Sequence, residues 1–195
     1  MIYLVRHGES TANVDGRYSG ITDVELSQRG RKQAFAAGVN LKRKKIENIF
    51  SSPLKRAIDT AKIISRENCF DENNIIVEKS LIEVNFGIFE NMTWDEMRLS
   101  HMEETEKWIQ LQHRYKFPNG EGYEDIIKRV SAFVDGIPDN SVVVTHFGVI
   151  QSMMLYLNIA DDKSLWQYEI SNCDILVLNN KKIETIIKCC PEGTV

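Results

Sequence analysis

Two short apolar runs, each ending at a histidine, constrain the fold of this chain most. Residues 1–5 lead into Arg6-His7, and residues 141–145 lead into His146. Apolar runs of this length are typical of strands buried on both faces, as in a parallel sheet covered by helices. We therefore expect two buried strands, each with a histidine just after its carboxyl end.

Helix and strand patterns alternate along the rest of the chain. A helix is predicted over 27–41 with Ser27 as N-cap, and another over 52–66 with Ser52 as N-cap and Pro53 in the first turn. A capping box beginning at Thr93 predicts a helix over 94–114, and Asn179-Asn180 predicts a two-residue hairpin turn. The other predictions are helices over 123–134 and 149–157 and strands over 46–50, 75–77, 175–178 and 182–187.

This alternation predicts an α/β fold. We expect a three-layer α/β/α sandwich with a mostly parallel sheet and an antiparallel edge. The length of 195 residues and the absence of a Pro-, Gly- or Ser-rich linker predict a single domain over 1–195. A small cap insertion is predicted at about 88–118, where aromatic residues either pack the cap onto the core or hold an apolar or heteroaromatic leaving group.

The location of the protein is predicted from what the sequence lacks. Its apolar runs are far shorter than the ~20 residues that span a membrane, and the N-terminus lacks the layout of a signal peptide. The cysteines form no C-x-x-C pair and lie near no histidine at zinc spacing; they are Cys69, Cys173, Cys189 and Cys190. We therefore expect a cytoplasmic protein with no membrane partner.

Charge is distributed unevenly along the chain. The net charge is −4, but residues 1–66 contain 13 Lys and Arg against 6 Asp and Glu, whereas residues 67–195 contain 11 against 22. This asymmetry fits either an anionic partner near the basic segment or scattered surface charge. The basic run 42–45 has no interleaved aromatic residues and lies at the expected end of a helix, so no nucleic-acid partner is expected.

The two histidines that follow buried strands are candidates for one shared site. Ligands of open α/β sheets bind at the carboxyl edge of the strands, where His7 and His146 would both lie. Arg6 precedes His7, and Arg56 falls one turn into the helix after the second strand, at the same edge. Arginines and helix N-termini both favour phosphate, so the predicted guest is a phosphoryl group on a small substrate.

Phosphoryl chemistry in this chain is expected to use side chains alone. The sequence has no glycine-rich P-loop and no obvious carboxylate cage, so neither a metal nor another cofactor is expected. A neutral imidazole can attack phosphorus and form a phosphohistidine, while a neighbouring acid protonates the leaving alkoxide. Glu83 lies among apolar residues and is either a buried acid or an exposed strand-end residue. His101 and His113 have polar neighbours and are predicted to lie on the surface.

A series of sequence blocks opens with Arg6-His7-Gly8-Glu9-Ser10 and extends over nearly the whole chain. The later members are Asn13, Arg17, Gly20, Asp23, Leu26 and Gly30, followed by the blocks 51–61, 81–87, 119–130 and 142–150. Together they resemble the R-H-G-E-[ST], S-S-P-L-x-R-A and V-V-[ST]-H-x-G patterns of the histidine phosphatase superfamily, the phosphoglycerate-mutase-like proteins. The resemblance implies the fold of that family.

The resemblance also implies roles for the residues at the predicted edge. His7 would be the phosphorylated nucleophile, and Arg6, Arg56 and His146 would bind the phosphoryl group and stabilise its charge. Glu83 would act as the general acid and then as the base that activates water. The residues implied in substrate contact are Asn13, Thr22 and Phe147.

Departures from the family pattern bear on the substrate more than on the reaction. Phe147 stands where the family often has glycine, and Gly122 where it has serine. The short chain lacks the larger insertion of the mutases, which implies an open pocket and favours a metal-independent phosphomonoester hydrolase. A mutase, a sugar bisphosphatase, a broad-specificity phosphatase and a non-catalytic phosphate-binding protein are the alternatives. The sequence leaves the oligomeric state open, with a dimer as one alternative.

Overall fold

A six-stranded sheet forms the centre of the computed structural model, which describes residues 1–189. Its order is β4-β3-β6-β1-β7-β8; the first four strands are parallel, and β7 and β8 are antiparallel to their neighbours. The strands are β1 (Ile2–Arg6), β3 (Asn48–Ser51), β4 (Ile76–Val77), β6 (Ser141–Thr145), β7 (Ile175–Asn179) and β8 (Lys182–Ile187). This topology confirms the predicted α/β fold with an antiparallel edge.

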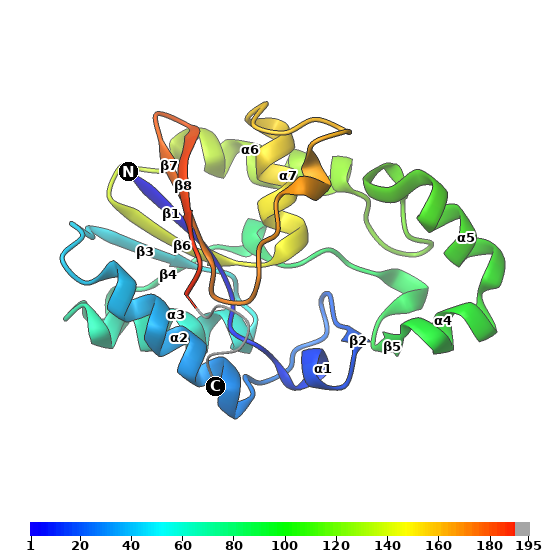
Figure 1. Ribbon diagram of the computed structural model, residues 1–195, viewed down its shortest axis with the longest axis horizontal. Coiled ribbons are helices and arrows are strands. Elements are labelled where there is room, and N and C mark those ends of the chain that lie inside the picture. Colours follow the sequence, from blue (N-terminus) through cyan, green and yellow to red (C-terminus); the bar gives the residue numbers. More distant parts are fainter. Residues whose placement is uncertain (190–195) are drawn as a thin grey trace.

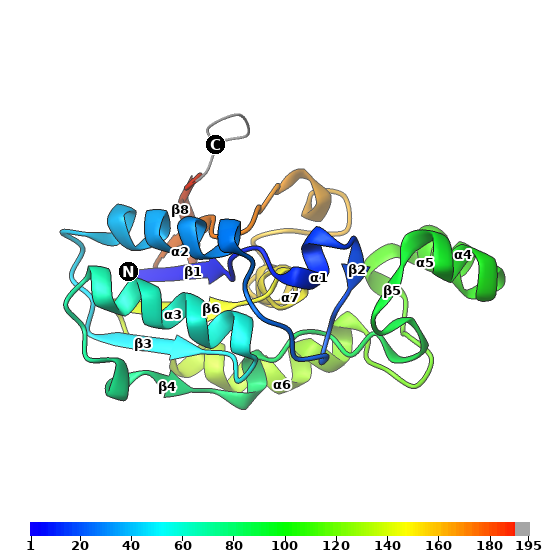
Figure 2. The ribbon, with the colours of Figure 1, turned by 90° about the horizontal axis from the view of Figure 1, so that it is seen from below.

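Helices cover both faces of the sheet, as Figures 1 and 2 show. One face carries α2 (Gln28–Leu41) and α3 (Lys55–Glu67), and the other carries α6 (Tyr123–Gly136) and α7 (Phe147–Tyr156). Successive side chains of β1 alternate between two cores, because strand residues point to opposite faces in turn. Tyr3 and Val5 pack with α2 and α3, whereas Ile2 and Leu4 pack with α6 and α7. The three predicted layers are therefore confirmed.

The segment 88–118, which we call the cap segment, lies to one side of the sandwich beside α1 (Thr11–Val14) and β2 (Arg17–Tyr18) (Figure 1). Within it β5 (Met92–Thr93) pairs with β2, and α4 (Trp94–Ser100) and α5 (Met102–Leu111) follow. Its aromatic rings pack together: the Trp108 ring centroid lies 5.0 Å from that of Phe117 and 6.0 Å from that of Phe89. Short 3-10 helices complete the chain: η1 (Glu72–Asn74), η2 (Lys79–Leu81), η3 (Gly87–Phe89), η4 (Gln112–Arg114) and η5 (Leu165–Gln167).

Two predicted helix starts are confirmed because their signals are local. The Ser27 hydroxyl accepts a hydrogen bond from the Gly30 N–H at 2.9 Å, and α2 begins at the next residue. Thr93 and Glu96 form the predicted capping box at the start of α4. No helix within residues 1–189 is long and apolar enough to cross a membrane. The single domain with a cap stays a prediction, and Cys190 lies outside the described residues.

Four other predicted boundaries are wrong. They are two helix starts, one helix that is interrupted and one hairpin turn. The helix predicted from Ser52 begins at Lys55, and its N-cap is Leu54 without a side-chain bond. The helix predicted over 94–114 is broken at His101, whose φ of −140° and ψ of 47° are not helical. The hairpin turn lies one residue later than predicted, at Asn180 and Lys181, with φ values of 49° and 60° typical of a type I′ turn. Finally, α7 begins at Phe147, two residues before the predicted start.

A pair of glycine substitutions tests how tightly α2 packs against the segment after β1. A Cβ at Gly30 would overlap the carbonyl oxygen of Glu9, whereas a Cβ at Gly136 would meet nothing within 4 Å. We expect Gly30→Ala to lower the free energy of unfolding by about 2 kcal/mol through overpacking. Gly136→Ala should raise it by about 0.5 kcal/mol, because it removes freedom from the unfolded chain. Urea unfolding measures both; equal effects of the two substitutions would contradict this packing.

Candidate active site

The parallel pairing of β1 with β6 brings the two predicted histidines together. Arg6 is in register with Thr145, and the His7 N–H donates to the Thr145 carbonyl at 2.9 Å. His7 and His146 follow these two strand ends, and their ring centroids lie 5.0 Å apart. Both imidazoles are buried. The site therefore lies at the carboxyl edge of the sheet, where α/β proteins bind ligands.

The hydrogen bond at Nδ1 fixes the tautomer of His7, that is, which of its two ring nitrogens carries the proton. Nδ1 lies 2.7 Å from the carbonyl oxygen of Gly8, which can only accept, so Nδ1 carries the proton. Burial, together with the guanidinium groups of Arg56 and Arg6, lowers the pKa of His7 well below that of a free imidazole. His7 is therefore neutral at neutral pH, and Nε2 presents its lone pair to the site.

Arg56 is a buried cation held by the loop that follows β2. Its guanidinium donates to the carbonyl oxygens of Ser19, Gly20 and Thr22 at 3.0, 2.7 and 2.9 Å. Its Nε donates to Nε2 of His7 at 3.3 Å. Because carbonyl oxygens carry no net charge, these contacts orient the guanidinium and leave its positive charge for an anion.

Arg6 directly precedes His7, and in the described part of the chain only part of its guanidinium group is hydrogen-bonded. Its Nη1 donates to the carbonyl oxygen of Ile170 at 2.8 Å, and its guanidinium lies 5.1 Å from the ring centroid of Phe147. Its buried Nε has no hydrogen-bond partner within residues 1–189. A buried N–H without a partner raises the free energy of the folded state, and a bound anion could accept its hydrogen bond.

Glu83 is buried, which excludes the exposed alternative left by the sequence. The Val84 N–H donates to Oε1 at 2.9 Å, and the Gly148 N–H, in the first turn of α7, donates to Oε2 at 3.4 Å. A Cβ at position 148 would lie 2.8 Å from Oε1, so glycine is needed for this close approach. Burial raises the pKa of Glu83, although the two amides and Arg56 partly oppose that rise. Glu83 can therefore hold a proton nearer to neutral pH than an exposed carboxyl can.

The remaining predicted contacts differ in position. Asn13 and Phe147 line the cavity, and Asn13 Oδ1 also accepts from the backbone N–H of Ser10 at 3.0 Å. Thr22 is not among the cavity-lining residues; its hydroxyl donates to Glu90 at 2.6 Å, and its carbonyl holds Arg56. The structure thus places Thr22 behind the cationic group, and its contact with a substrate stays a prediction.

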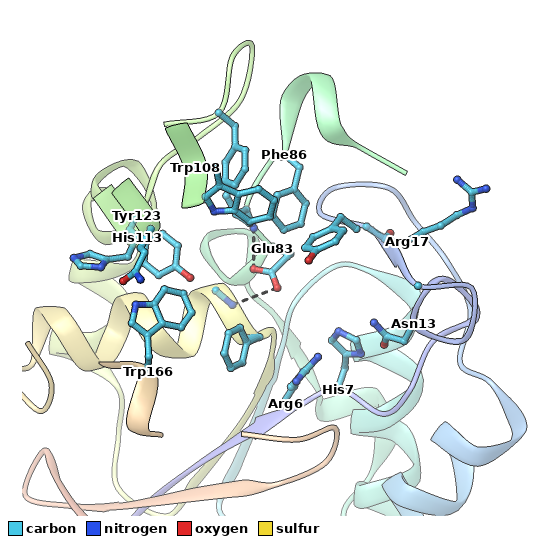
Figure 3. Close-up of a pocket in the computed structure, with 18 residues that line it drawn as sticks. Arg6, His7, Asn13, Arg17, Glu83, Phe86, Trp108, His113, Tyr123 and Trp166 are labelled. Carbon is cyan, nitrogen blue, oxygen red and sulfur yellow. Dashed lines mark hydrogen bonds between the residues drawn. The ribbon is translucent and has the colours of Figure 1, made fainter. Parts of the chain in front are cut away.

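A cavity of about 470 Å³ opens over Arg6, His7 and Glu83. Figure 3 shows these three side chains facing Phe86, Trp108 and other aromatic rings on the far wall. Arg17 belongs to the family motif and Trp108 to the predicted cap. The lining residues that sequence reasoning did not single out include Tyr18, Phe86, Tyr123 and Trp166. Their only common signal is aromatic character, which equally predicts core packing. Within residues 1–189, no three His, Cys, Asp or Glu residues are grouped to hold a metal ion.

His113 was predicted to lie on the surface, and this is wrong. Its side chain is 9% exposed and lines the cavity, and its Nε2 lies 2.8 Å from Asp162. Asp162 is 49 residues away in sequence, so no local pattern could show this contact. His101 is half-buried, and its ring packs edge-on against Phe89 with centroids 5.7 Å apart.

The fold and this edge define the class of the chain: an α/β/α sandwich with two histidines and two arginines gathered at the carboxyl edge of the sheet, beside a cavity of about 470 Å³. Residues 2–189 match the model of the histidine phosphatase superfamily (branch 1), and the chain belongs to that superfamily. The family resemblance of the sequence is therefore confirmed.

Individual relatives differ in what they act on. Phosphoserine phosphatase 1 of Hydrogenobacter thermophilus is 30% identical over 191 residues, which are 95% of this chain and 89% of that protein. The 6-phosphofructo-2-kinase/fructose-2,6-bisphosphatase of Gallus gallus is 33% identical over 161 residues, 80% of this chain but 32% of that longer protein. The alpha-ribazole phosphatase structure from Shigella flexneri superposes with a TM-score of 0.77 at 26% identity, covering 93% of this chain and 92% of that chain.

The buried carboxyl of Glu83 should affect stability in a pH-dependent way. Its pKa is raised on folding, so the folded protein binds more protons than the unfolded chain between the two pKa values. This contribution to stability is therefore present at low pH and is lost as pH rises through the folded pKa. Glu83→Gln should raise the free energy of unfolding at pH 7 and have a smaller effect near pH 4. Urea unfolding across this range measures it; a stabilisation that is larger at pH 4 would contradict the raised pKa.

Proposed function

We propose that this protein is a metal-independent phosphomonoester hydrolase that acts through a phosphohistidine on His7. The observation that carries the proposal is the buried neutral imidazole of His7, whose Nδ1–H is bound by the Gly8 carbonyl and whose Nε2 lone pair accepts from Arg56 Nε. Membership of the histidine phosphatase superfamily supports the same reaction. Among its relatives are proteins named as phosphatases that act on different phosphate esters.

In the first half of the reaction, Nε2 of His7 attacks phosphorus as the ester P–O bond breaks. Arg6 and Arg56 stabilise the charge on the phosphoryl oxygens, in a site already desolvated and oriented for it. The proton of the Glu83 carboxyl passes to the leaving alkoxide, which departs as the alcohol. The phosphoryl group is then bonded to Nε2.

In the second half, water attacks phosphorus and the P–N bond breaks. The Glu83 carboxylate takes a proton from that water, and inorganic phosphate leaves. His7 returns to the neutral form with its proton on Nδ1, where the Gly8 carbonyl holds it throughout. Atoms and charge balance without a cofactor in either half.

For the substrate, we propose a phosphate ester whose alcohol carries an aromatic ring system, such as α-ribazole-5′-phosphate of cobalamin biosynthesis. The sequence pattern resembles that of α-ribazole-5′-phosphate phosphatases, and the aromatic wall of the cavity supports this choice. Among the lining residues of the described chain, Glu83 is the only carboxylate, and it is assigned to proton transfer. A substrate with an ammonium group, such as phosphoserine, would therefore lack a dedicated partner.

The reaction is tested with 4-nitrophenyl phosphate in the presence of a metal chelator. We expect wild-type activity to persist with chelator and His7→Ala to lower kcat/KM by roughly 10³-fold or more, because the nucleophile is lost. Rapid quenching in base should trap a phosphoryl label on wild type that is absent from His7→Ala. His101→Ala is the matched control and should retain full activity. Activity that survives His7→Ala, or that the chelator abolishes, would exclude the proposed mechanism.

The substrate class is tested by a panel of phosphate esters. We expect kcat/KM for α-ribazole-5′-phosphate to exceed that for phosphoserine by up to about tenfold, since an aromatic contact contributes about 0.5–1.5 kcal/mol. Trp166→Ala, at the wall of the cavity, should reduce this preference, and Leu99→Ala, 87% exposed on the cap segment, should not. A preference for phosphoserine would favour that alternative, and equal rates would favour a broad-specificity phosphatase.

A further inference from the structure

Ser52 forms a buried contact with the second histidine of the site. It follows the end of β3, where its N–H donates to the Val144 carbonyl at 2.9 Å, because β3 and β6 are parallel neighbours. Its Oγ lies 2.7 Å from Nε2 of His146. Both residues are fully buried. The sheet order β3-β6-β1 thus sets Ser52, His146 and His7 in a row along one edge.

His146 holds a single ring proton at neutral pH, so its tautomer decides what it can do. Burial, together with Arg56 and the neighbouring His7, lowers the pKa of His146 well below that of a free imidazole. Its Nδ1 is buried and has no hydrogen-bond partner within residues 1–189. If Nδ1 carries the proton, it can donate to a phosphoryl oxygen; if it carries the lone pair, it repels that oxygen.

Counting donors and acceptors decides between the two tautomers. The Ser52 hydroxyl has one proton, and its only other hydrogen bond in the described chain is a long one accepted from the Leu54 N–H at 3.4 Å. If the hydroxyl donates to Nε2 of His146, Nδ1–H is the one unsatisfied group, and a bound anion satisfies it. If Nε2–H donates instead, both the hydroxyl proton and the Nδ1 lone pair are buried without partners. Because every buried donor or acceptor without a partner costs free energy, the arrangement that leaves one such group is favoured over the one that leaves two.

We propose that Ser52 is a positioning residue that donates to Nε2 of His146 and so fixes the proton on Nδ1, where it faces the transferring phosphoryl group. This inference rests on the proposed function for its kinetic consequence but not for the tautomer itself. Ser52 lies two residues before Leu54, the N-cap of α3, and its hydroxyl contacts a residue 94 positions away in sequence.

The tautomer is measured directly by long-range ¹H–¹⁵N NMR of the ¹⁵N-histidine-labelled protein, with His146→Gln to assign the signals. We expect His146 in the wild type to show a protonated Nδ1 and an unprotonated Nε2. Ser52→Ala should shift this equilibrium toward Nε2–H, and Ser52→Thr, which retains the hydroxyl, should restore it. Ser51→Ala is the matched control, because the Ser51 hydroxyl is also buried but bonds the Ser52 carbonyl at 2.9 Å.

Kinetics give the second readout. We expect Ser52→Ala to lower kcat for 4-nitrophenyl phosphate by about tenfold or more, since a donor to the phosphoryl group is misaligned. Ser52→Thr should stay within about threefold of the wild type, as should Ser51→Ala. Circular dichroism checks folding, and should Ser52→Ala not fold, the wild-type spectrum and Ser52→Thr decide the question.

Two results would overturn the proposal: a wild-type His146 with its proton on Nε2, or a Ser52→Ala protein whose tautomer and kcat match those of Ser51→Ala. The proposed function fails separately, because it is lost when His7→Ala retains activity, whatever tautomer His146 shows.

Discussion

The parallel register between β1 and β6 is the constraint on which the rest of the site depends. It sets Arg6 opposite Thr145, and therefore His7 beside His146. The register is strongly specified, because successive side chains of β1 enter two different cores and a slip by one residue would exchange them. The catalytic geometry is thus determined by the most buried part of the molecule, which is also the part least able to deform.

Arg56 is a buried positive charge beside His7, and backbone carbonyl oxygens of residues 19–22 accept its hydrogen bonds. Burying two guanidinium groups is costly unless their N–H groups are satisfied. Carboxylates would satisfy them but would also cancel their charge. Arg56 is held instead by three carbonyl oxygens, so it stays hydrogen-bonded and cationic. Burial and the same positive charge lower the pKa of His7 and keep that imidazole neutral, as the proposed nucleophilic role requires. On the proposed function, one arrangement would therefore serve both anion binding and nucleophile activation.

The sequence predicts the features of this structure that depend on neighbours in the chain. The strands, the Ser27 cap and the capping box at Thr93 are local patterns, and the structure confirms them. Ser52 has the same local signal as Ser27, but α3 begins only at Lys55, and the Ser52 hydroxyl contacts His146, 94 residues away in sequence. His113 was misplaced for the same reason, because Asp162 is distant in sequence.

The excess of basic residues in 1–66 is a weak predictor of where the site lies. The excess of basic residues in 1–66 includes surface cations that pair with acids, such as Arg31 with Asp59 and Lys42 with Glu67. Only Arg6 and Arg56 from this segment contact or closely approach the buried imidazole of His7. The basic excess and the anion site therefore share a segment, but the site depends on burial and geometry rather than on the number of cations.

The two histidines occupy equivalent positions after neighbouring strands, yet the proposed reaction requires opposite behaviour from them. A nucleophile has to present a lone pair to phosphorus, whereas a stabilising group has to present a proton to oxygen. The Gly8 carbonyl can only accept, so it takes the Nδ1–H of His7 and leaves Nε2 unprotonated, with a lone pair that accepts from Arg56 Nε. A hydroxyl can donate, so on our proposal Ser52 occupies Nε2 of His146 and leaves Nδ1 protonated. His7 and His146 would then differ in function because their hydrogen-bond partners differ: a carbonyl that accepts makes one a nucleophile, and a hydroxyl that donates makes the other a proton donor to the phosphoryl group.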